Sequence, residues 1–399
     1  MACGRVRLPV LACFVLLGVE MGIWGSRIPE VRHQADLNYG TLGLALFALP
    51  LATVLSLPWA SHAVERYGSG SVLRAAVLAA PVALVPVGFA RGLAELIPAL
   101  LLFGSALCLL NISMNARAVA IEKAYARPLM SSFHAAYSIG AIAGAGTGGL
   151  LTQLHLSLTV SLTGTSVFLF GAGVSLAWLF GDELGDKLST LAGERVAPGI
   201  RRRDLHWAVM VLGVLAMFGA AAEGAMTDWS AVYLHDALAV PAGLAAWGLT
   251  CFSAAVAAGR LVGDRLADRW GPLRLIRVGA VVAGTGLAAG VLSHTVAGAY
   301  AGLILMGLGV SCVVPQIMSI AGHAQVGNPS RNIAIVTGLS TVGSLVGPVA
   351  IGAVAAADGL SVAVTVPAVL MLAVAGGAAF IGLAKSSGRA NRSAQRSSS

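Results

Sequence analysis

The segments 65-ERYG-68 and 268-DRWG-271 share one pattern: an acid, an Arg, a variable residue and a Gly, with 203 positions between copies (65 to 268). A second pair of segments repeats near the same separation. The apolar stretch 138-SIGAIAGA-145 corresponds to 341-TVGSLVGP-348 at this offset. Because independent matches share one offset, we expect the chain to consist of two homologous halves.

Both halves are dominated by apolar runs. Of the 399 residues, 57% are hydrophobic and 11% are charged, with a mean hydropathy of +0.85. Soluble domains carry about 25% charged residues, so the composition predicts a membrane protein. A membrane-spanning helix needs about 20 mostly apolar residues. Twelve runs meet this length, at residues 8–27, 41–63, 72–90, 95–117, 130–153, 158–181, 206–234, 240–262, 274–293, 297–320, 332–356 and 360–383.

The basic residues fall mainly on one side of these spans. With the N-terminus in the cytoplasm, only Arg27, Arg32 and Arg91 of the 25 Lys and Arg residues lie outside, which leaves 22 inside. The positive-inside rule then places both termini in the cytoplasm. Arg greatly outnumbers Lys, as in GC-rich bacterial genomes, so the expected location is the inner membrane of a bacterium. The predicted organisation is a six-helix bundle at 1–181, a cytoplasmic linker at 182–204, a second six-helix bundle at 205–384 and a disordered cytoplasmic tail at 385–399.

One loop resembles a known motif. The segment 264-DRLADRWGPLR-274 resembles the G-x-L-A-D-R-x-G-R-R loop of the major facilitator superfamily, although Asp264 follows Gly263 at its first position. The resemblance implies an all-α membrane protein with twelve transmembrane helices in two pseudo-symmetric bundles, which works by alternating access as a monomer. Four segments resemble the bacterial YbjJ-like transporters, relatives of the fucose permease: 22-GIWGSRIPEV-31, 111-NISMNARAV-119, 128-PLMSSFHAAYSIG-140 and 223-EGAMTDWSAVYL-234.

Glu20 and Glu223 stand inside apolar runs. Glu20, Trp24 and Arg27 follow each other at helical spacing and share one stripe, and Glu223 shares a face with Thr227. An acid at the centre of a membrane helix costs about 2.5–3.5 kcal/mol, so such residues turn toward the bundle interior. We therefore predict that Glu20 and Glu223 take up and release protons. The alternative is a hydrogen bond or ion pair between helices.

Other polar side chains predict a cavity that binds the transported molecule. Amides at Asn111 and Asn115 could bind a polar cargo such as a sugar hydroxyl, or could join helices. His134 could relay protons or pack the loop before its span. Trp24 could stack on a cargo ring or belong to the aromatic belt at the membrane surface. The predicted cavity residues are Trp24, Asn111, Asn115, His134, Thr227, Gln316 and Ser319.

The two repeated loops are expected to form a cytoplasmic gate, as the resemblance implies. Acid and Arg side chains there would bridge neighbouring helices in one conformation and separate in the other. Asp228, near the outer end of its span, is expected to serve a gate on the other side. The predicted gating residues are Arg27, Glu65, Arg66, Gly68, Asp228, Asp268, Arg269 and Gly271.

The function that fits these patterns is proton-coupled secondary transport of a small polar or amphipathic molecule. The segment 140-GAIAGAGTGG-149 resembles a Gly-rich antiporter motif, which favours efflux of a metabolite or drug, although close helix packing would select the same glycines. Uptake of a sugar-like solute is the alternative, and a membrane sensor that does not transport is a more distant one.

Other classes of protein are excluded by what the sequence lacks. It has no H-E-x-x-H motif, no G-x-S-x-G in a credible turn and no nucleotide-binding loop, so neither an enzyme nor an ATP-driven pump is expected. The five Cys residues show no metal-like spacing, and no cofactor or metal is predicted. The net charge of +8 is explained by membrane orientation and does not suggest binding to nucleic acid.

Overall fold

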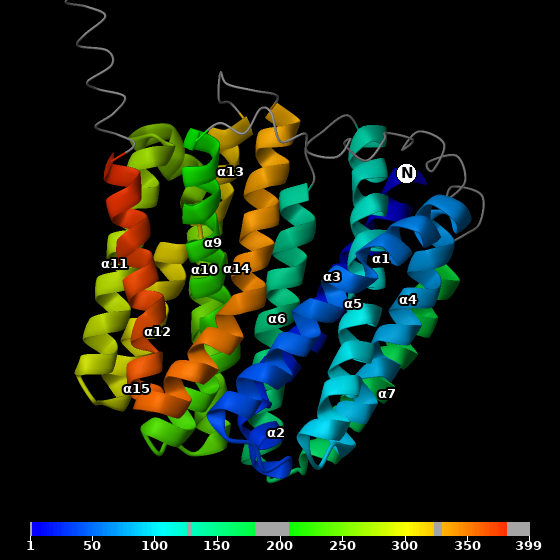
Figure 1. Ribbon diagram of the computed structural model, residues 1–399. Helices are drawn as coiled ribbons and strands as arrows, with labels where there is room; N and C mark the ends of the chain where they lie inside the picture. The colour runs from blue at the N-terminus through cyan, green and yellow to red at the C-terminus, as the bar shows by residue number, and fades with distance from the viewer. Residues whose placement is uncertain (1, 126–129, 180–206, 323–328, 381–399) are drawn as a thin grey trace, which may run out of the picture. The chain divides into compact units, whose positions relative to one another are not determined.

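The structure is a computed structural model that describes residues 2–125, 130–179, 207–322 and 329–380 (Figure 1). The predicted linker at 182–204 and the predicted tail at 385–399 lie outside these residues. Regular structure in the described part is helical throughout, with η1 a 3₁₀-helix and η3 a π-helix. In chain order the elements are α1 (Ala2–Ser26), α2 (Ile28–Gln34), α3 (Tyr39–Tyr67), α4 (Ser69–Leu84), η1 (Val85–Phe89), α5 (Leu93–Tyr125), α6 (Met130–Gln153), α7 (Leu158–Leu179), α9 (Trp207–Val232), η3 (Tyr233–Ala237), α10 (Ala242–Trp270), α11 (Pro272–Leu292), α12 (Val296–Val310), α13 (Val313–Gly322), α14 (Pro329–Asp358) and α15 (Leu360–Ala363).

The helices match the predicted spans. Among the described residues, 11 helical segments are long and apolar enough to cross a membrane, and each overlaps a predicted span. The remaining prediction, residues 130–153, is the 24-residue helix α6. Many Gly, Ser and Thr residues lower the hydropathy of α6, and it packs along α1, where it does not need a fully apolar surface. The predicted all-helical membrane fold is confirmed.

Packing groups the chain into two compact units. Within the described residues, unit 1 comprises α1 to α7 with Thr227–Ser253 and Pro348–Leu360. Unit 2 comprises the part of α9 up to Met226, Ala254–Gly347 and the segment from Ser361 onward. Helices α9, α10 and α14 each contribute to both units. The division into bundles at 1–181 and 205–384 stays a prediction.

Glycines bring the first helix of each repeat into contact with the fifth. In unit 1, a Cβ added to Gly140 of α6 would collide with the backbone of α1 at Val15. In unit 2, a Cβ added to Gly343 of α14 would collide with the backbone of α9 at Met217. The two glycines are 203 positions apart (140 to 343), so the packing repeats at the offset found in the sequence. Small residues allow such backbone contact where lipid supplies no hydrophobic drive.

The two repeated loops have the same backbone. Gly68 ends α3 with φ 79° and ψ 147°, and Gly271 ends α10 with φ 79° and ψ 148°. The N–H of Gly68 donates to the carbonyl of Val64 at 3.0 Å, and the N–H of Gly271 donates to the carbonyl of Ala267 at 2.8 Å. Residues with a side chain rarely adopt this positive φ, so Gly is the residue that allows the tight turn into the next helix.

We predict opposite effects for two Gly→Ala substitutions in helices of unit 1. Gly164→Ala, on α7, adds a methyl group with no atom of another helix within 4 Å and should stabilise the protein by about 0.5–1 kcal/mol through helix propensity. Gly140→Ala should destabilise it by about 1–3 kcal/mol because the new Cβ meets the carbonyl carbon of Val15 at 2.9 Å. Thermal unfolding of the purified protein measures both, and equal shifts would contradict the close contact of α1 with α6.

Candidate functional site

Glu20 is a buried acid in the middle of a membrane-spanning helix. It lies on α1, is 0% exposed, and neither carboxylate oxygen has a hydrogen-bond partner among the described residues. An ionised carboxylate in this position would lose its hydration with no donor to compensate, which costs several kcal/mol. The neutral, protonated carboxyl group avoids this cost. Trp24, one turn further along α1, is also buried at 2% exposure.

Arg27, predicted to gate, ties the end of α1 to the end of α6. Its guanidinium donates to the hydroxyl of Thr152 and, at 3.0 Å, to the carbonyl of Leu156. Glu30 completes the group, with an oxygen 3.6 Å from Arg27 and a hydrogen bond of 2.7 Å from Thr152. Burial lowers the pKa of Arg27 from its ordinary value, whereas the charge of Glu30 raises it. These contacts lie within one repeat and hold α1 and α6 together.

An amide pair lies on α5. The side-chain N–H of Asn115 donates to the backbone carbonyl of Asn111 at 2.8 Å and to its side-chain oxygen at 3.0 Å. Asn111 is exposed and Asn115 is half-buried. The pair is therefore fixed in one orientation, with the NH₂ group of Asn111 and the carbonyl of Asn115 available for further hydrogen bonds. His134, on α6, is exposed, and its ring meets Phe14 edge-on with centroids 5.6 Å apart.

Glu223 forms an ion pair with a partner that we did not predict. Its carboxylate is 2.8 Å from the guanidinium of Arg260, on α10, and both side chains are partly exposed. Both residues lie within membrane-spanning segments. This is the arrangement named above as the alternative to proton coupling, and the coupling role of Glu223 stays a prediction. Arg260 falls inside the predicted span 240–262, so a base and an acid in two neighbouring apolar runs were the signal for the pair.

A break between α12 and α13 supports this ion pair. The predicted span 297–320 is interrupted at Ser311 and Cys312, which form a turn. In a continuous helix the carbonyl of Ser311 would accept from residue 315, but Pro315 has no N–H. Arg260 approaches this carbonyl instead, with its Nε at 3.4 Å. Interrupted membrane helices that expose backbone groups are typical of binding sites in transporters.

The remaining predicted cavity residues differ in exposure. Thr227 on α9 is half-buried, Gln316 on α13 is buried with 8% exposure, and Ser319, also on α13, is exposed. Thr227 belongs to unit 1 and the two α13 residues belong to unit 2, and the predicted cavity stays a prediction.

The predicted gating residues lie at helix ends or near them. Glu65 and Arg66 at the end of α3 are exposed, as are Asp268 and Arg269 at the end of α10, and each pair precedes its positive-φ glycine, Gly68 or Gly271. The guanidinium of Arg66 lies over the ring of Tyr67 at 5.5 Å. Among the described residues, no ion pair joins Glu65 or Asp268 to a neighbour.

At the α2 end of unit 1, an acid that was not predicted, Asp236, contacts α2, and the gating role of Asp228 stays a prediction. Asp228 is half-buried, whereas Asp236 on η3 forms an ion pair with Arg32 of α2 at 3.0 Å. The ring of Tyr39 lies near Trp229 with centroids 6.4 Å apart. Arg32 was counted above as one of the three outward basic residues. This isolated charge was the feature of the sequence that could have indicated the ion pair.

Solved transporter structures share this fold. A bacterial homologue of the human lysosomal transporter Spinster, inward-facing and unoccupied, superimposes with a TM-score of 0.72 at 13% identity, over 94% of this chain and 96% of that one. The nucleoside transporter NupG superimposes with a TM-score of 0.69 at 13% identity, over 95% and 98% of the two chains. At this identity the likeness shows the fold alone.

Relatives of known sequence cover nearly the whole chain. An MFS-type transporter of Yersinia pestis is 31% identical over 371 residues, 92% of this chain and 93% of its own length. The transporter y4wD of Sinorhizobium fredii is 32% identical over 87% of this chain and 90% of its own. Membrane protein MosC of Rhizobium meliloti is 29% identical over 87% and 83%. The family model of the Major Facilitator Superfamily matches residues 10–324 and again residues 209–398. With these matches and its helical membrane fold, the chain belongs to the major facilitator superfamily of transporters.

Proposed function

We propose that this transporter moves a small polar or amphipathic molecule across the cytoplasmic membrane of a bacterium by alternating access, coupled to protons. The two repeats rock against each other and open the binding site to one side at a time. Within the superfamily we place it in the YbjJ-like branch related to the fucose permease. It acts as a monomer with both termini in the cytoplasm, and its loops at Gly68 and Gly271 gate the cytoplasmic side.

One observation carries the proposal of proton coupling: Glu20 is fully buried, and both carboxylate oxygens lack a partner in the described part of the chain. Such a group is stable when protonated and costly when charged. A conformational change that admits water or brings a cation near Glu20 releases the proton. Alternate burial and exposure of this one carboxyl group therefore ties proton movement to the transport cycle.

The polar groups of the described helices indicate the chemistry of the cargo. Asn111 offers amide donors, and Asn115 offers an acceptor, as a hydroxyl-bearing molecule requires. Arg260 and Glu223 offer a base and an acid that are already paired with each other. A cargo with its own charge or several hydroxyls can exchange with either partner, whereas a purely apolar cargo cannot.

Efflux is the proposed direction, and uptake of a sugar-like solute is the alternative. The glycines that favoured efflux, such as Gly140, lie in the contact between α1 and α6, so packing alone accounts for them. Direction is therefore decided by flux measured under gradients of opposite sign.

A proteoliposome experiment tests coupling through Glu20. Purified protein should move a labelled cargo, found by screening metabolites, drugs and sugars, faster when a pH gradient is imposed. Glu20→Gln, which cannot ionise, should retain exchange of cargo across the membrane and lose the response to the gradient by at least about tenfold. The matched control is Glu95→Gln, an exposed acid at the start of α5, which should behave as the wild type. A gradient response that survives Glu20→Gln would contradict the proposal.

A double-mutant cycle tests the ion pair of Glu223 with Arg260. Glu223→Gln and Arg260→Gln should each slow transport and lower the melting temperature by a few degrees, because each removes the attraction between the two charges in membrane-spanning segments. Because both groups are partly exposed, each substitution should lower the free energy of unfolding by about 1 kcal/mol. The double variant should be less damaged than the sum of the single variants. Additive losses would mean that the two side chains act independently.

A third substitution tests the helix break. Pro315→Ala restores the backbone N–H that the carbonyl of Ser311 lacks, so α12 and α13 should become one continuous helix. Arg260 then loses one of its two acceptors. We expect thermal stability to rise or stay constant while transport falls, measured on the same preparation. Unchanged transport would mean that the helix break is not needed for transport.

A further inference from the structure

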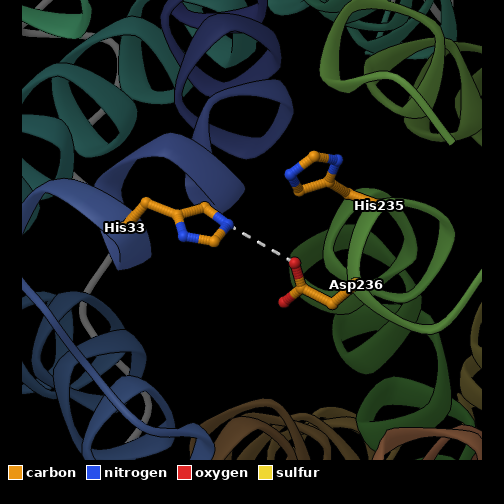
Figure 2. A group of neighbouring side chains, drawn as sticks. All are labelled: His33, His235 and Asp236. Atoms are coloured by element: carbon orange, nitrogen blue, oxygen red, sulfur yellow. Dashed lines mark ion pairs between the residues drawn. The ribbon is translucent and has the colours of Figure 1, made fainter. Parts of the chain in front are cut away.

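Three side chains able to bind a metal ion converge in unit 1 (Figure 2). His33 is on α2, and His235 and Asp236 are on η3. Their ligand atoms all lie within 4.8 Å of one another, and Nε2 of His33 is 3.5 Å from Oδ1 of Asp236. The rings of His33 and His235 meet edge-on with centroids 5.4 Å apart. We refer to these three residues as the His–Asp cluster.

The tautomer of His235 is fixed by a backbone group. Its Nδ1 lies 2.9 Å from the carbonyl of Val240, so this nitrogen carries the proton and donates it. The other nitrogen, Nε2, is the one that is left to bind a metal. Histidines that bind metals typically donate their second ring N–H to a carbonyl or carboxylate in this way, which sets both tautomer and ring orientation.

The carboxylate of Asp236 is also held in place. Arg32 donates from Nε at 3.0 Å to Oδ2, with Nη2 at the same distance, which leaves Oδ1 directed at His33. Arg32 is itself held by the carbonyl of Leu37 at 3.3 Å and by the ring of Tyr39 at 4.6 Å. Asp236 is 6% exposed, while His33 is 54% exposed and open to approach from solvent.

Local backbone geometry presents the two later ligands side by side. Tyr233–Ala237 form a π-helix, and the N–H of Val240 closes the turn on the carbonyl of Leu234 at 3.0 Å. Ala239 adopts a φ of 53°, which is uncommon for a residue with a side chain. π-Helical turns inside longer helices occur frequently at functional sites. Here the turn places adjacent residues, His235 and Asp236, toward α2.

We propose that the His–Asp cluster is a binding site for a divalent transition metal, with Zn²⁺ as the best fit. Two imidazoles and one carboxylate suit Zn²⁺, and three protein ligands leave a fourth position for water or a solute. With bonds of about 2.0–2.1 Å in tetrahedral geometry, ligand atoms lie about 3.4 Å apart. The ligand atoms of His33 and Asp236 already have this spacing. Rotation of the exposed His33 ring can shorten the remaining distance between the ligand atoms of the two histidines. Arg32 reduces the charge of the site, so we expect micromolar rather than tighter affinity.

A bound metal would clamp α2 to η3. Arg32 and Asp236 are 204 residues apart, so the clamp joins segments that follow the first helix of each repeat. This consequence rests on the proposed function, in which the repeats separate at one end during each cycle. Zn²⁺ would then hold this end closed and slow transport.

Binding is tested on the purified full-length chain after removal of any affinity tag and treatment with a chelator. Zn²⁺ should raise the melting temperature by several degrees and bind at one ion per chain, because a ligand of the folded state stabilises it. Co²⁺ should show the visible absorption bands of a tetrahedral site. His33→Ala and His235→Ala should abolish all three signals. His62→Ala, an exposed histidine on α3, is the matched control and should retain them.

Two outcomes would overturn the metal site: no stabilisation of the wild type by Zn²⁺, or equal stabilisation of the His33→Ala variant. Flux in proteoliposomes is a separate readout. Zn²⁺ should slow the wild type at least about fivefold and leave His33→Ala unaffected; binding without inhibition upholds the site and overturns the clamp. A protein that binds Zn²⁺ but moves no cargo even without metal contradicts the proposed function and not the site.

Discussion

The hydrocarbon core of a bilayer offers no hydrogen-bonding partner, and this constraint governs the described structure. Every charged or polar group in a membrane-spanning segment must find a partner within the protein, remain neutral or face water. Glu223 meets the requirement through Arg260, whereas the carboxylate oxygens of Glu20 have no partner among the described residues, which favours the protonated form. The same environment removes the hydrophobic drive between helices, so α1 and α6 associate through glycines that bring their backbones into contact.

The features that the sequence predicted are those encoded by short periodic patterns. Runs of about 20 apolar residues locate the helices because length and hydropathy alone decide which segments cross a membrane. The 203-residue offset predicted that corresponding positions would be equivalent, and Gly68 and Gly271 have backbone angles that agree within 1°. Close helix packing, named as the alternative to an antiporter motif, is what the glycines of α6 show in their contact with α1.

Features that depend on the tertiary structure were missed. Arg260 was interpreted as a marker of membrane orientation, whereas it pairs with an acid on another helix. Asp236 lies 204 residues from Arg32, and no spacing rule connects two residues so far apart. Asp228 was predicted to gate because it lies near the outer end of its apolar run, and Asp236 was not considered, although the π-helical turn presents it to α2. A local change of helical pitch is not visible in hydropathy.

The proline at the start of α13 has a consequence for the thermodynamics of the cycle. Because Pro315 has no N–H, it cannot donate the helical hydrogen bond to the carbonyl oxygen of Ser311, and Arg260 donates to this oxygen instead. Any incoming molecule that draws Arg260 away must leave behind a donor of its own, or admit a water molecule, to cover that oxygen. In the proposed function, cargo binding at Arg260 is thus an exchange of one hydrogen-bonding arrangement for another. Small differences between molecules can then decide which ones are accepted.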